Sequence, residues 1–375
     1  MRVLLVVSDP KQGILNYQTQ LALKLKSIGI DIEVITWTLK GQKSIYNIEL
    51  SSMIKLNNIP MHIYTELKYS GFKSMNGNVV ELAKLLANNK FDIVHVHGPL
   101  SAMIFRRALK FNSYSKIINA ISRSFGSGVK AKFKSLLSGC ISHICSDKIL
   151  VLSEFEKIKT YWYLKKVTTA YNPIDVDHIN KYSSLNPSSI NIRRDLSIEE
   201  NNKIICCFSN FSENKNQEKI IHSLHYMSKN VTLVLAGEGE TKDRIRQVVR
   251  DLKLEERVIL LSRIPENLVK EYLCGSDLAI SISNTETFGY SIAEPILLRV
   301  PLLTTPAGIA FELEKLKMLR TISHDISPIQ LAHEINEAID DRFNILMQQE
   351  QARNYLIDKC SVGNYVNNLI DIYKV

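Results

Sequence analysis

Seven residues near the beginning of the chain, RVLLVVS at positions 2–8, predict a β-strand that is buried on both faces. After a loop around Gly13, apolar residues recur with helical spacing over residues 17–28. Gly29 ends this predicted helix, and a second apolar run follows at residues 31–36. This order of strand, helix and strand is typical of a parallel sheet that helices cover on both sides.

The same alternation continues along the chain and begins again after a polar stretch. In the first half, strands are expected at residues 62–64, 93–97, 116–120 and 148–153. In the second half, strands are expected at residues 203–209, 231–236, 258–262, 278–282 and 302–304. Helices are expected there at residues 216–227, 242–252, 266–273 and 290–298, with a mainly helical tail from residue 328. The sequence therefore predicts an α/β protein with two doubly wound domains.

The boundary between the two domains is expected near residues 173–200. Asn172-Pro173 predicts an extended or turning chain, and SSLNPSSIN at residues 183–191 is polar. We divide the chain into a first domain at residues 1–175, a second at residues 176–355, and a C-terminal helix at residues 356–375 that can pack back on the first domain. A length of 375 residues agrees with two domains, because one domain usually has 100–200 residues.

Composition excludes several classes of protein. With 45% hydrophobic and 23% charged residues, the chain resembles ordinary globular proteins and not disordered ones. It has no apolar run long enough to cross a membrane, so a cytoplasmic location is expected. The six cysteines lack C-x2-C spacing and lie in or beside apolar runs, which predicts buried thiols in a reducing compartment and no structural zinc.

Positive charge is concentrated in the first half of the chain. Residues 1–175 contain 24 Lys and Arg against 11 Asp and Glu, a net charge of +13, whereas residues 176–375 contain 23 against 27, a net charge of −4. No acidic residue lies between Asp92 and Asp147. The basic residues of that stretch are Arg106, Arg107, Lys110, Lys116, Arg123, Lys130, Lys132 and Lys134. Such a stretch attracts phosphate-rich surfaces.

Three interpretations of this basic stretch remain open. It can be a solvated basic face without a partner. Nucleic acid is disfavoured, because neither an aromatic RNA-binding signature nor helix-turn-helix spacing accompanies the charges. The preferred partner is an anionic membrane or a lipid-phosphate acceptor, because KAKFKSLL at residues 130–137 mixes Lys130, Lys132 and Lys134 with apolar residues. Arg123 is a further candidate for contact with a charged acceptor.

The stretch SISNTETFGYSIAE at residues 281–294 is the strongest candidate site. It predicts a strand that runs into a loop and then into a helix. Four backbone amides can point at an anion or at sugar hydroxyls near the helix start, those of Phe288, Gly289, Tyr290 and Ser291. Glu294 can accept two hydrogen bonds from a ribose diol, and Glu286 can hold hydroxyls of a transferred sugar. For Glu286 the alternative is a solvated loop carboxylate.

This stretch resembles the hallmark of the group 1 retaining glycosyltransferases, a Glu-x7-Glu motif with an embedded Phe-Gly, here from Glu286 to Glu294. Other segments are similar to that family in the same order along the chain. They are the first Gly-rich loop at residues 6–13, the Asp-x-x-His-x-His segment at 92–97, the Asn-x-x-Asp linker at 172–175, the phosphate-lysine loop at 212–217, the Gly-x-Gly at 237–239 and the closing helix at 360–373. The resemblance implies a GT-B fold, in which two Rossmann-like domains face one another across a cleft.

The resemblance also implies roles for single residues. It implies that Lys215 binds the donor diphosphate and that His97 contacts the donor sugar. Gly13 is expected to let the first loop approach the donor and the acceptor closely. Asn210 stands where most relatives have an arginine, and it can donate only a neutral hydrogen bond. Gly237 belongs to a tight turn near the nucleotide base or ribose. We expect the first domain to bind mostly the acceptor and the second the donor.

The resemblance implies transfer of a sugar from a UDP- or GDP-linked donor to a hydroxyl of a glycan or lipid-linked acceptor, with retention of configuration. No cofactor and no metal ion are expected, since the sequence has no Asp-x-Asp metal signature. We expect a cytoplasmic enzyme of bacterial cell-surface polysaccharide synthesis, peripheral at the inner face of the cell membrane, without a nucleic-acid partner. His95 is expected to be structural and to point to the opposite face of its strand from His97.

Two alternatives are kept. One is a nucleotide-sugar epimerase of the same fold, which would act on the donor without an acceptor. The other is a non-catalytic partner subunit of a glycosyltransferase, which Asn210 suggests. A dinucleotide site at Gly237-Glu238-Gly239 is disfavoured, because Lys242 stands in place of the third glycine of G-x-G-x-x-G.

Overall fold

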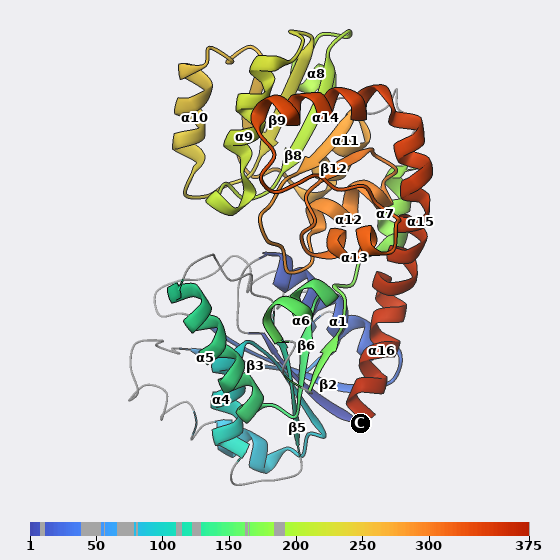
Figure 1. Ribbon diagram of the computed structural model, residues 1–375. Helices are drawn as coiled ribbons and strands as arrows, with labels where there is room; N and C mark the ends of the chain where they lie inside the picture. Colours follow the sequence, from blue (N-terminus) through green and yellow to red (C-terminus); the bar gives the residue numbers. More distant parts are fainter. Residues whose placement is uncertain are drawn as a thin grey trace. The chain divides into compact units, whose positions relative to one another are not determined.

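The structure is a computed structural model of the chain, and it forms two compact units (Figure 1). The residues that the structure describes are 1–7, 12–38, 54–55, 57–65, 79, 82–109, 115–121, 129–161, 164, 166–183 and 192–374. The first unit consists of residues 1–174 and 362–375, and the second of residues 175–361. The chain therefore leaves the first unit once and returns to it at its C-terminal end.

The first unit contains a parallel sheet of seven strands in the order β3-β2-β1-β4-β5-β6-β7. The strands are β1 (Arg2–Val7), β2 (Asp31–Thr38), β3 (Met61–Thr65), β4 (Ile93–His97), β5 (Lys116–Ile121), β6 (Lys148–Val151) and β7 (Val167–Thr169). The strand that was predicted from RVLLVVS is confirmed, and it lies in the middle of the sheet. The sequence prediction missed β7, which has three residues and only one buried side chain.

Helices cover both faces of the first sheet. They include α1 (Gln12–Ser27), α4 (Pro99–Ala108), α5 (Val129–Cys145), α6 (Glu154–Tyr161) and α16 (Val362–Lys374). Alternate residues of β1 enter different cores: Val3 and Leu5 pack with α1 and α16, and Leu4 and Val6 pack with α4. This explains why every residue from position 3 to position 7 is apolar.

The second unit contains a parallel sheet of five strands in the order β10-β9-β8-β11-β12. The strands are β8 (Lys203–Phe208), β9 (Val231–Ala236), β10 (Val258–Leu261), β11 (Leu278–Ser281) and β12 (Leu302–Thr304). Its helices are α7 (Val176–Ser183), α8 (Ile192–Asp195), α9 (Gln217–Ser223), α10 (Lys242–Asp251), α11 (Glu266–Cys274), α12 (Tyr290–Leu297), α13 (Ile309–Lys315), α14 (Pro328–Asp340) and α15 (Arg342–Cys360). The second doubly wound sheet is therefore confirmed.

Some boundaries differ from the sequence prediction. Gly13 was expected in a loop, but α1 already begins at Gln12, so Gly13 lies in its first turn. The helix predicted at residues 216–227 consists of α9 and the 3₁₀ turn η4 (Leu224–Tyr226), and a further 3₁₀ turn, η3 (Glu213–Lys215), lies directly before it. Asn216 separates η3 from α9, because its φ angle of +54° lies in the left-handed region and no α-helix can continue through it.

The C-terminal tail contributes to both units. The helix expected at residues 356–375 is divided between the end of α15 and the whole of α16, with Ser361 between them. Apolar residues of α16 complete the core of the first unit beside α1 (Figure 1). They are Tyr365, Val366, Leu369, Ile372 and Tyr373, each less than 9% exposed.

The six cysteines are free thiols. Cys145, Cys206, Cys207 and Cys360 are buried as expected, but Cys140 is exposed and Cys274 is half-buried. The prediction for Cys140 is wrong because the apolar run around it lies on the outer side of α5. Within the described ranges, no helix combines the length and the apolar character that a membrane span requires.

Candidate active site

The candidate site lies where two neighbouring strands of the second sheet end. β8 and β11 are paired and parallel, so their carboxyl ends meet at one edge of the sheet. The loop after β8 leads to Lys215, and the loop after β11 leads to Glu286. Open α/β sheets bind their ligands at this edge, because the loops and helix N-termini converge there.

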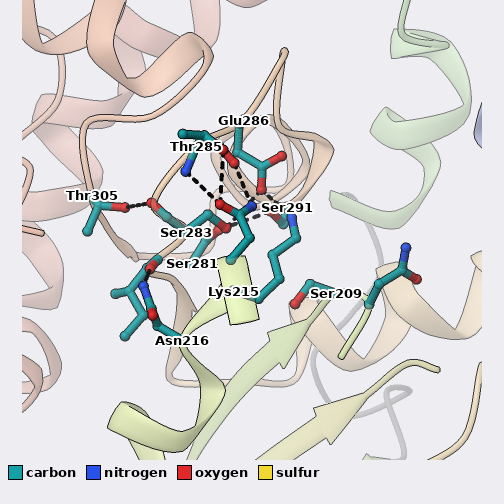
Figure 2. A network of polar contacts seen from close by, with 12 residues as sticks. Ser209, Lys215, Asn216, Ser281, Ser283, Thr285, Glu286, Ser291 and Thr305 are labelled. Carbon is teal, nitrogen blue, oxygen red and sulfur yellow. Dashed lines mark hydrogen bonds and ion pairs between the residues drawn. The ribbon is translucent and has the colours of Figure 1, made fainter. Parts of the chain in front are cut away.

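Lys215 and Glu286 form an ion pair in which Lys215 Nζ donates to Glu286 Oε1 (Figure 2). Ser283 Oγ donates to the same carboxylate oxygen over 2.9 Å. The two charged side chains are 17% and 14% exposed. They are therefore shielded from bulk water, which strengthens their electrostatic effect on a ligand, while a small part of each stays accessible.

Asn214 fixes the distance between the two loops that carry this ion pair. Its Nδ2 donates to the carbonyl oxygen of Thr285 over 2.8 Å. Its Oδ1 accepts from the backbone N of Thr285 at 3.0 Å and from Thr285 Oγ1 at 2.9 Å. One side chain thus makes three hydrogen bonds to the residue directly before Glu286. The residue directly after Asn214 is Lys215, so this contact sets the relative position of the two charges.

Asn216 joins the same two loops from the other side of Lys215. Its Nδ2 donates to the carbonyl oxygen of Ile282 and to Oδ1 of Asn284, both over 2.9 Å. The sequence prediction missed Asn214, Asn216 and Ser283. The available signal was the polar composition of the two loops, with asparagines on both sides of Lys215 and the run Ser-Asn-Thr before Glu286.

Two glycines allow the backbone to fold closely around Glu286. Gly289 has a φ angle of +98°, and a Cβ atom on it would lie 2.8 Å from Ile292 Cδ1. Gly308, before α13, has a φ angle of +56°, and a Cβ atom on it would lie 2.8 Å from Glu286 Cβ. Side chains other than hydrogen are therefore excluded at both positions. Gly308 is a site residue that the sequence prediction missed.

The helix α12 begins directly after Gly289, and its first turn holds the predicted amide donors. Phe288 is buried at 1% exposure, with its ring against Tyr290, and its carbonyl oxygen accepts a hydrogen bond of 2.8 Å from the backbone N of Ile309. Ser291 Oγ lies 3.0 Å from Ser281 Oγ at the end of β11. The first turn of a helix presents backbone N–H groups and a partial positive charge, which suits a phosphate.

Glu294 lies one turn further along α12. Desolvation raises the pKa of its carboxyl group to about 7, and the positive charge of Lys270 opposes this rise. Lys270 is itself 2% exposed and donates to Glu266 Oε1 over 2.5 Å. Pro295 follows Glu294 within α12, which starts at Tyr290.

Asn210 and Gly237 lie in two adjoining loops of the same unit. Asn210 is exposed, and its carbonyl oxygen accepts a hydrogen bond of 2.9 Å from Gln217 Nε2. A Cβ atom on Gly237 would lie 2.1 Å from the carbonyl oxygen of Ser209. Glycine is required at position 237 because the backbones after β8 and β9 run against one another.

His97, the last residue of β4, lies in the first unit. Its ring stacks on His95, with centroids 5.1 Å apart and an angle of 20° between the planes. The prediction that His95 points to the opposite face is wrong, because side chains two positions apart on a strand share a face. His95 Nδ1 lies 2.6 Å from the hydroxyl oxygen of Tyr373. Desolvation lowers the pKa of His97 to about 3, so its ring is neutral at pH 7.

The remaining predicted residues also belong to the first unit. Gly13 lies in the first turn of α1. Lys130, Lys132 and Lys134 lie in the first two turns of α5. Arg123 lies outside the described residues. In the part of the chain that the structure describes, no three His, Cys, Asp or Glu side chains form a group that could hold a metal ion.

Solved structures with the same fold include glycosyltransferases of the GT-B class. The Anabaena protein HepE, whose structure is solved in complex with UDP and glucose, superposes with a TM-score of 0.79 at 17% identity, covering 100% of this chain and 99% of that one. A glycosyltransferase from Rickettsia africae superposes with a TM-score of 0.80 at 18% identity, covering 100% and 97%. At these identities the likeness concerns the fold.

Family models match both parts of the chain. Residues 188–358 match the model for glycosyl transferases group 1, and residues 12–178 match that for glycosyltransferase family 4. The fold and the site define a glycosyltransferase of GT-B type. Residues 188–358 of this chain belong to the group 1 glycosyltransferases, as the resemblance of the stretch from Glu286 to Glu294 predicted.

Curated relatives are enzymes of related kinds. The chain is 25% identical to the O-antigen biosynthesis glycosyltransferase WclY of Escherichia coli over 234 residues, which are 60% of this chain and 64% of that protein. It is also 25% identical over 264 residues to N-acetyl-alpha-D-glucosaminyl L-malate synthase of Bacillus anthracis, 67% of each chain. The match thus spans somewhat less than two thirds of WclY.

Proposed function

We propose that this glycosyltransferase moves a sugar from a UDP- or GDP-linked donor to a hydroxyl of a glycan or lipid-linked acceptor, with retention of the anomeric configuration. The Lys215–Glu286 pair carries the proposal. It holds a cation suited to a diphosphate directly beside a carboxylate suited to sugar hydroxyls. The N-terminus of α12, which can receive an anion, begins four residues after Glu286.

The relatives support the choice of donor and the biological setting. HepE is solved with UDP and with UDP-glucose, which supports a uridine nucleotide as donor. WclY is named for O-antigen biosynthesis, and two structural neighbours are named for lipopolysaccharide biosynthesis. We infer a role in the synthesis of bacterial cell-surface polysaccharide, at the cytoplasmic face of the membrane.

In the proposed reaction, donor binding replaces the internal ion pair. The diphosphate binds Lys215 Nζ, and the sugar hydroxyls donate hydrogen bonds to the Glu286 carboxylate. Each charged side chain thus exchanges its ion-pair partner for a group of the donor. The bond between the anomeric carbon and the diphosphate oxygen then breaks. The acceptor oxygen bonds to that carbon on the same face, and its proton passes to the departing phosphate oxygen. Lys215 stabilises the negative charge that develops there.

The other predicted residues complete this arrangement. The carboxylate of Glu294 accepts hydrogen bonds from the ribose diol. Gly289 permits the diphosphate to approach the first turn of α12. Asn210 and Gly237 border the donor, and His97 and Gly13 contact the sugar or the acceptor from the first unit. We propose that no metal ion and no cofactor take part, because Lys215 and α12 supply the positive charge.

The test replaces each member of the pair by a neutral side chain of similar size. Lys215→Met should lower transfer by about a hundredfold or more, because a donor aimed at developing charge contributes on the order of 3 kcal/mol. Glu286→Gln should also lower transfer, because it removes the charge-assisted hydrogen bonds that the carboxylate accepts from the sugar hydroxyls. Lys229→Met and Glu200→Gln, both at exposed positions of the second unit, serve as matched controls. Nucleotide release from a panel of UDP and GDP sugars gives the rate, and the product anomer by NMR gives the stereochemistry.

Two results would contradict the proposal. Near-normal transfer by both site variants would remove the pair from the reaction. Release of an altered donor in the absence of any acceptor would favour the epimerase instead. Unchanged melting temperatures of all four variants show that the comparison is made between folded proteins.

A second candidate is a non-catalytic partner subunit of a glycosyltransferase. Asn210 favours it, because a neutral amide stands where relatives carry a guanidinium, and Asn210 is exposed at the carboxyl end of β8. Transfer by the purified chain alone would eliminate this candidate. If the chain is active, Asn210→Arg should raise the rate by adding a second cation near the diphosphate.

A further inference from the structure

The helix α5 shows a reversed distribution of polar and apolar side chains over its described residues, 136–145. Its buried positions are small or polar: Ser138, Gly139, Ser142 and Cys145. Its exposed positions are apolar or thiol side chains: Leu136, Leu137, Cys140 and Ile144. A helix on the surface of a globular protein ordinarily has the opposite arrangement. The spacing of the four exposed residues places them on one face of the helix.

Contacts with the rest of the first unit fix α5 in this orientation. Ser142 Oγ accepts a hydrogen bond of 3.3 Å from Nδ2 of Asn119 in β5, and both residues are 0% exposed. Lys166 Nζ donates to the carbonyl oxygens of His143 and Ser146, over 2.8 and 3.0 Å, at the end of the helix. The helix α4 packs along α5 (Figure 1). Rotation of α5 to bury its leucines would break these contacts.

The exposed face of α5 therefore keeps large apolar side chains in water. Leu136 and Leu137 are each 52% exposed, and Ile144 is 75% exposed. A contiguous exposed apolar face of this kind marks a site of interaction with another apolar surface. The partner must accept aliphatic side chains.

Charge distinguishes between possible partners. Eight Lys and Arg and no acidic residue lie between Asp92 and Asp147, and three of the lysines, Lys130, Lys132 and Lys134, begin α5. A second copy of the chain packed face to face would bring these like charges together, which costs free energy. An anionic lipid surface offers an acyl region for the leucines and phosphate groups for the lysines.

We propose that α5 docks the first unit on an anionic lipid surface, with Leu136, Leu137, Cys140 and Ile144 at the boundary between head groups and acyl chains. The lysines of the first two turns bind the head-group phosphates. That this surface also delivers the acceptor rests on the proposed function, whereas the docking itself needs neither donor nor acceptor.

Flotation of the full chain with vesicles tests the docking. The vesicles consist of phosphatidylcholine alone or of phosphatidylcholine mixed with phosphatidylglycerol. The wild-type chain should float with the mixed vesicles and remain behind with the neutral ones. The pair Leu137→Gln and Ile144→Gln should weaken the binding about tenfold or more, because each lost aliphatic side chain removes burial. Charge reversal of Lys130, Lys132 and Lys134 to Glu should weaken it at least as much.

A matched pair on the second unit controls for a general loss of surface hydrophobicity. Leu316→Gln and Ile329→Gln replace residues that are 46% and 58% exposed, and they should leave vesicle binding unchanged. Both paired variants should melt as the wild type does, since the four side chains that they change are exposed.

Three results would overturn the proposal. They are absence of wild-type binding to the anionic vesicles, equal binding by the α5 pair and the control pair, or a dimer in lipid-free solution that the α5 pair makes monomeric. The last result would assign the face to a second copy of the chain. Nucleotide release from the donor, measured without vesicles, is a separate readout, so failure of the docking and failure of the proposed function can be distinguished.

Discussion

Glu294 is a candidate site residue whose charge should respond to pH near neutrality. Its carboxyl group has a pKa raised to about 7 by desolvation, whereas most carboxyl groups are ionised throughout this range. A ribose diol donates hydrogen bonds, so it prefers the ionised form, which only accepts them. In the proposed donor site, a proton and the ribose therefore compete for the carboxylate of Glu294.

The first prediction concerns this competition. Affinity for a nucleoside diphosphate should increase as pH rises through about 7 and become constant above about 8, because Glu294 is then fully ionised. Below pH 7 the dissociation constant should rise by up to about tenfold per pH unit. Calorimetric titration of UDP from about pH 6 to 8 measures this dependence. Glu294→Gln should remove the pH dependence of the dissociation constant that comes from Glu294. The pH dependence that comes from the phosphate groups of UDP should remain.

Asn214 should control catalysis without touching the ligand. Asn214→Ala removes three hydrogen bonds to Thr285 and releases the loop of Lys215 from that of Glu286. We expect transfer to fall by about tenfold to a hundredfold, because displacement of a reacting group by about 1 Å has an effect of this size. Steady-state kinetics should show the loss mainly in kcat, since both charges are still present.

Asn202→Ala is the matched control for Asn214→Ala. Asn202 lies in the same unit, directly before β8, and donates to Thr232 Oγ1 over 3.1 Å. Its loss should lower stability slightly and leave the transfer rate unchanged. Equal losses of rate in the two variants would mean that Asn214 stabilises the fold only.

At the scale of the element, the loop between β11 and α12 has little tolerance for added atoms. Gly289→Ala introduces a Cβ atom 2.8 Å from Ile292 Cδ1 at a φ angle of +98°. We expect a loss of stability of about 1–3 kcal/mol, because a side chain in this backbone region is strained and also collides. Chemical denaturation of the second unit measures the loss, and transfer should decrease with it.

Gly363→Ala provides the opposite case. Gly363 lies in the first turn of α16, and a Cβ atom on it would meet nothing within 4 Å. Alanine should stabilise this helix by up to about 1 kcal/mol, because glycine loses more backbone entropy on folding. If Gly289→Ala and Gly363→Ala changed the stability equally, the positive φ angle of Gly289 would not require glycine.

At the scale of the whole molecule, the first unit depends on the last helix of the chain. Deletion of residues 362–375 would expose the core contacts of α16 with α1 and β1. Five side chains that are almost fully buried would be lost, and each contributes about 1.5–3 kcal/mol. Their sum is comparable with the total stability of a domain, so the first unit should not remain folded.

Hydrogen exchange read by mass spectrometry checks this prediction. In the truncated chain, amides of the first unit should lose protection, while β8, β9 and β11 of the second unit should keep it. Full protection of β1 and β4 in the truncated chain would contradict the dependence on α16.

Much of the fold follows from local patterns. The mainly apolar runs at residues 93–97, 231–236 and 302–304 became strands with the predicted ends, because strands buried on both faces are rich in apolar residues. The short strand β7 and the first turn of α1 were not predictable in this way. Their residues are mixed in character, so neither segment shows a clear hydrophobic period.

The sequence by itself determined the family and the candidate site residues, because Glu286, Glu294 and Lys215 are of chemically specific types at motif spacings. Only the tertiary structure showed that Asn214 and Asn216 form hydrogen bonds between the loop of Lys215 and the loop of Glu286. Such contacts join residues about 70 positions apart in the chain, so no local pattern encodes them. The outward face of α5 has the same origin: hydrophobic periodicity shows that a helix has an apolar side, and only packing shows where that side points.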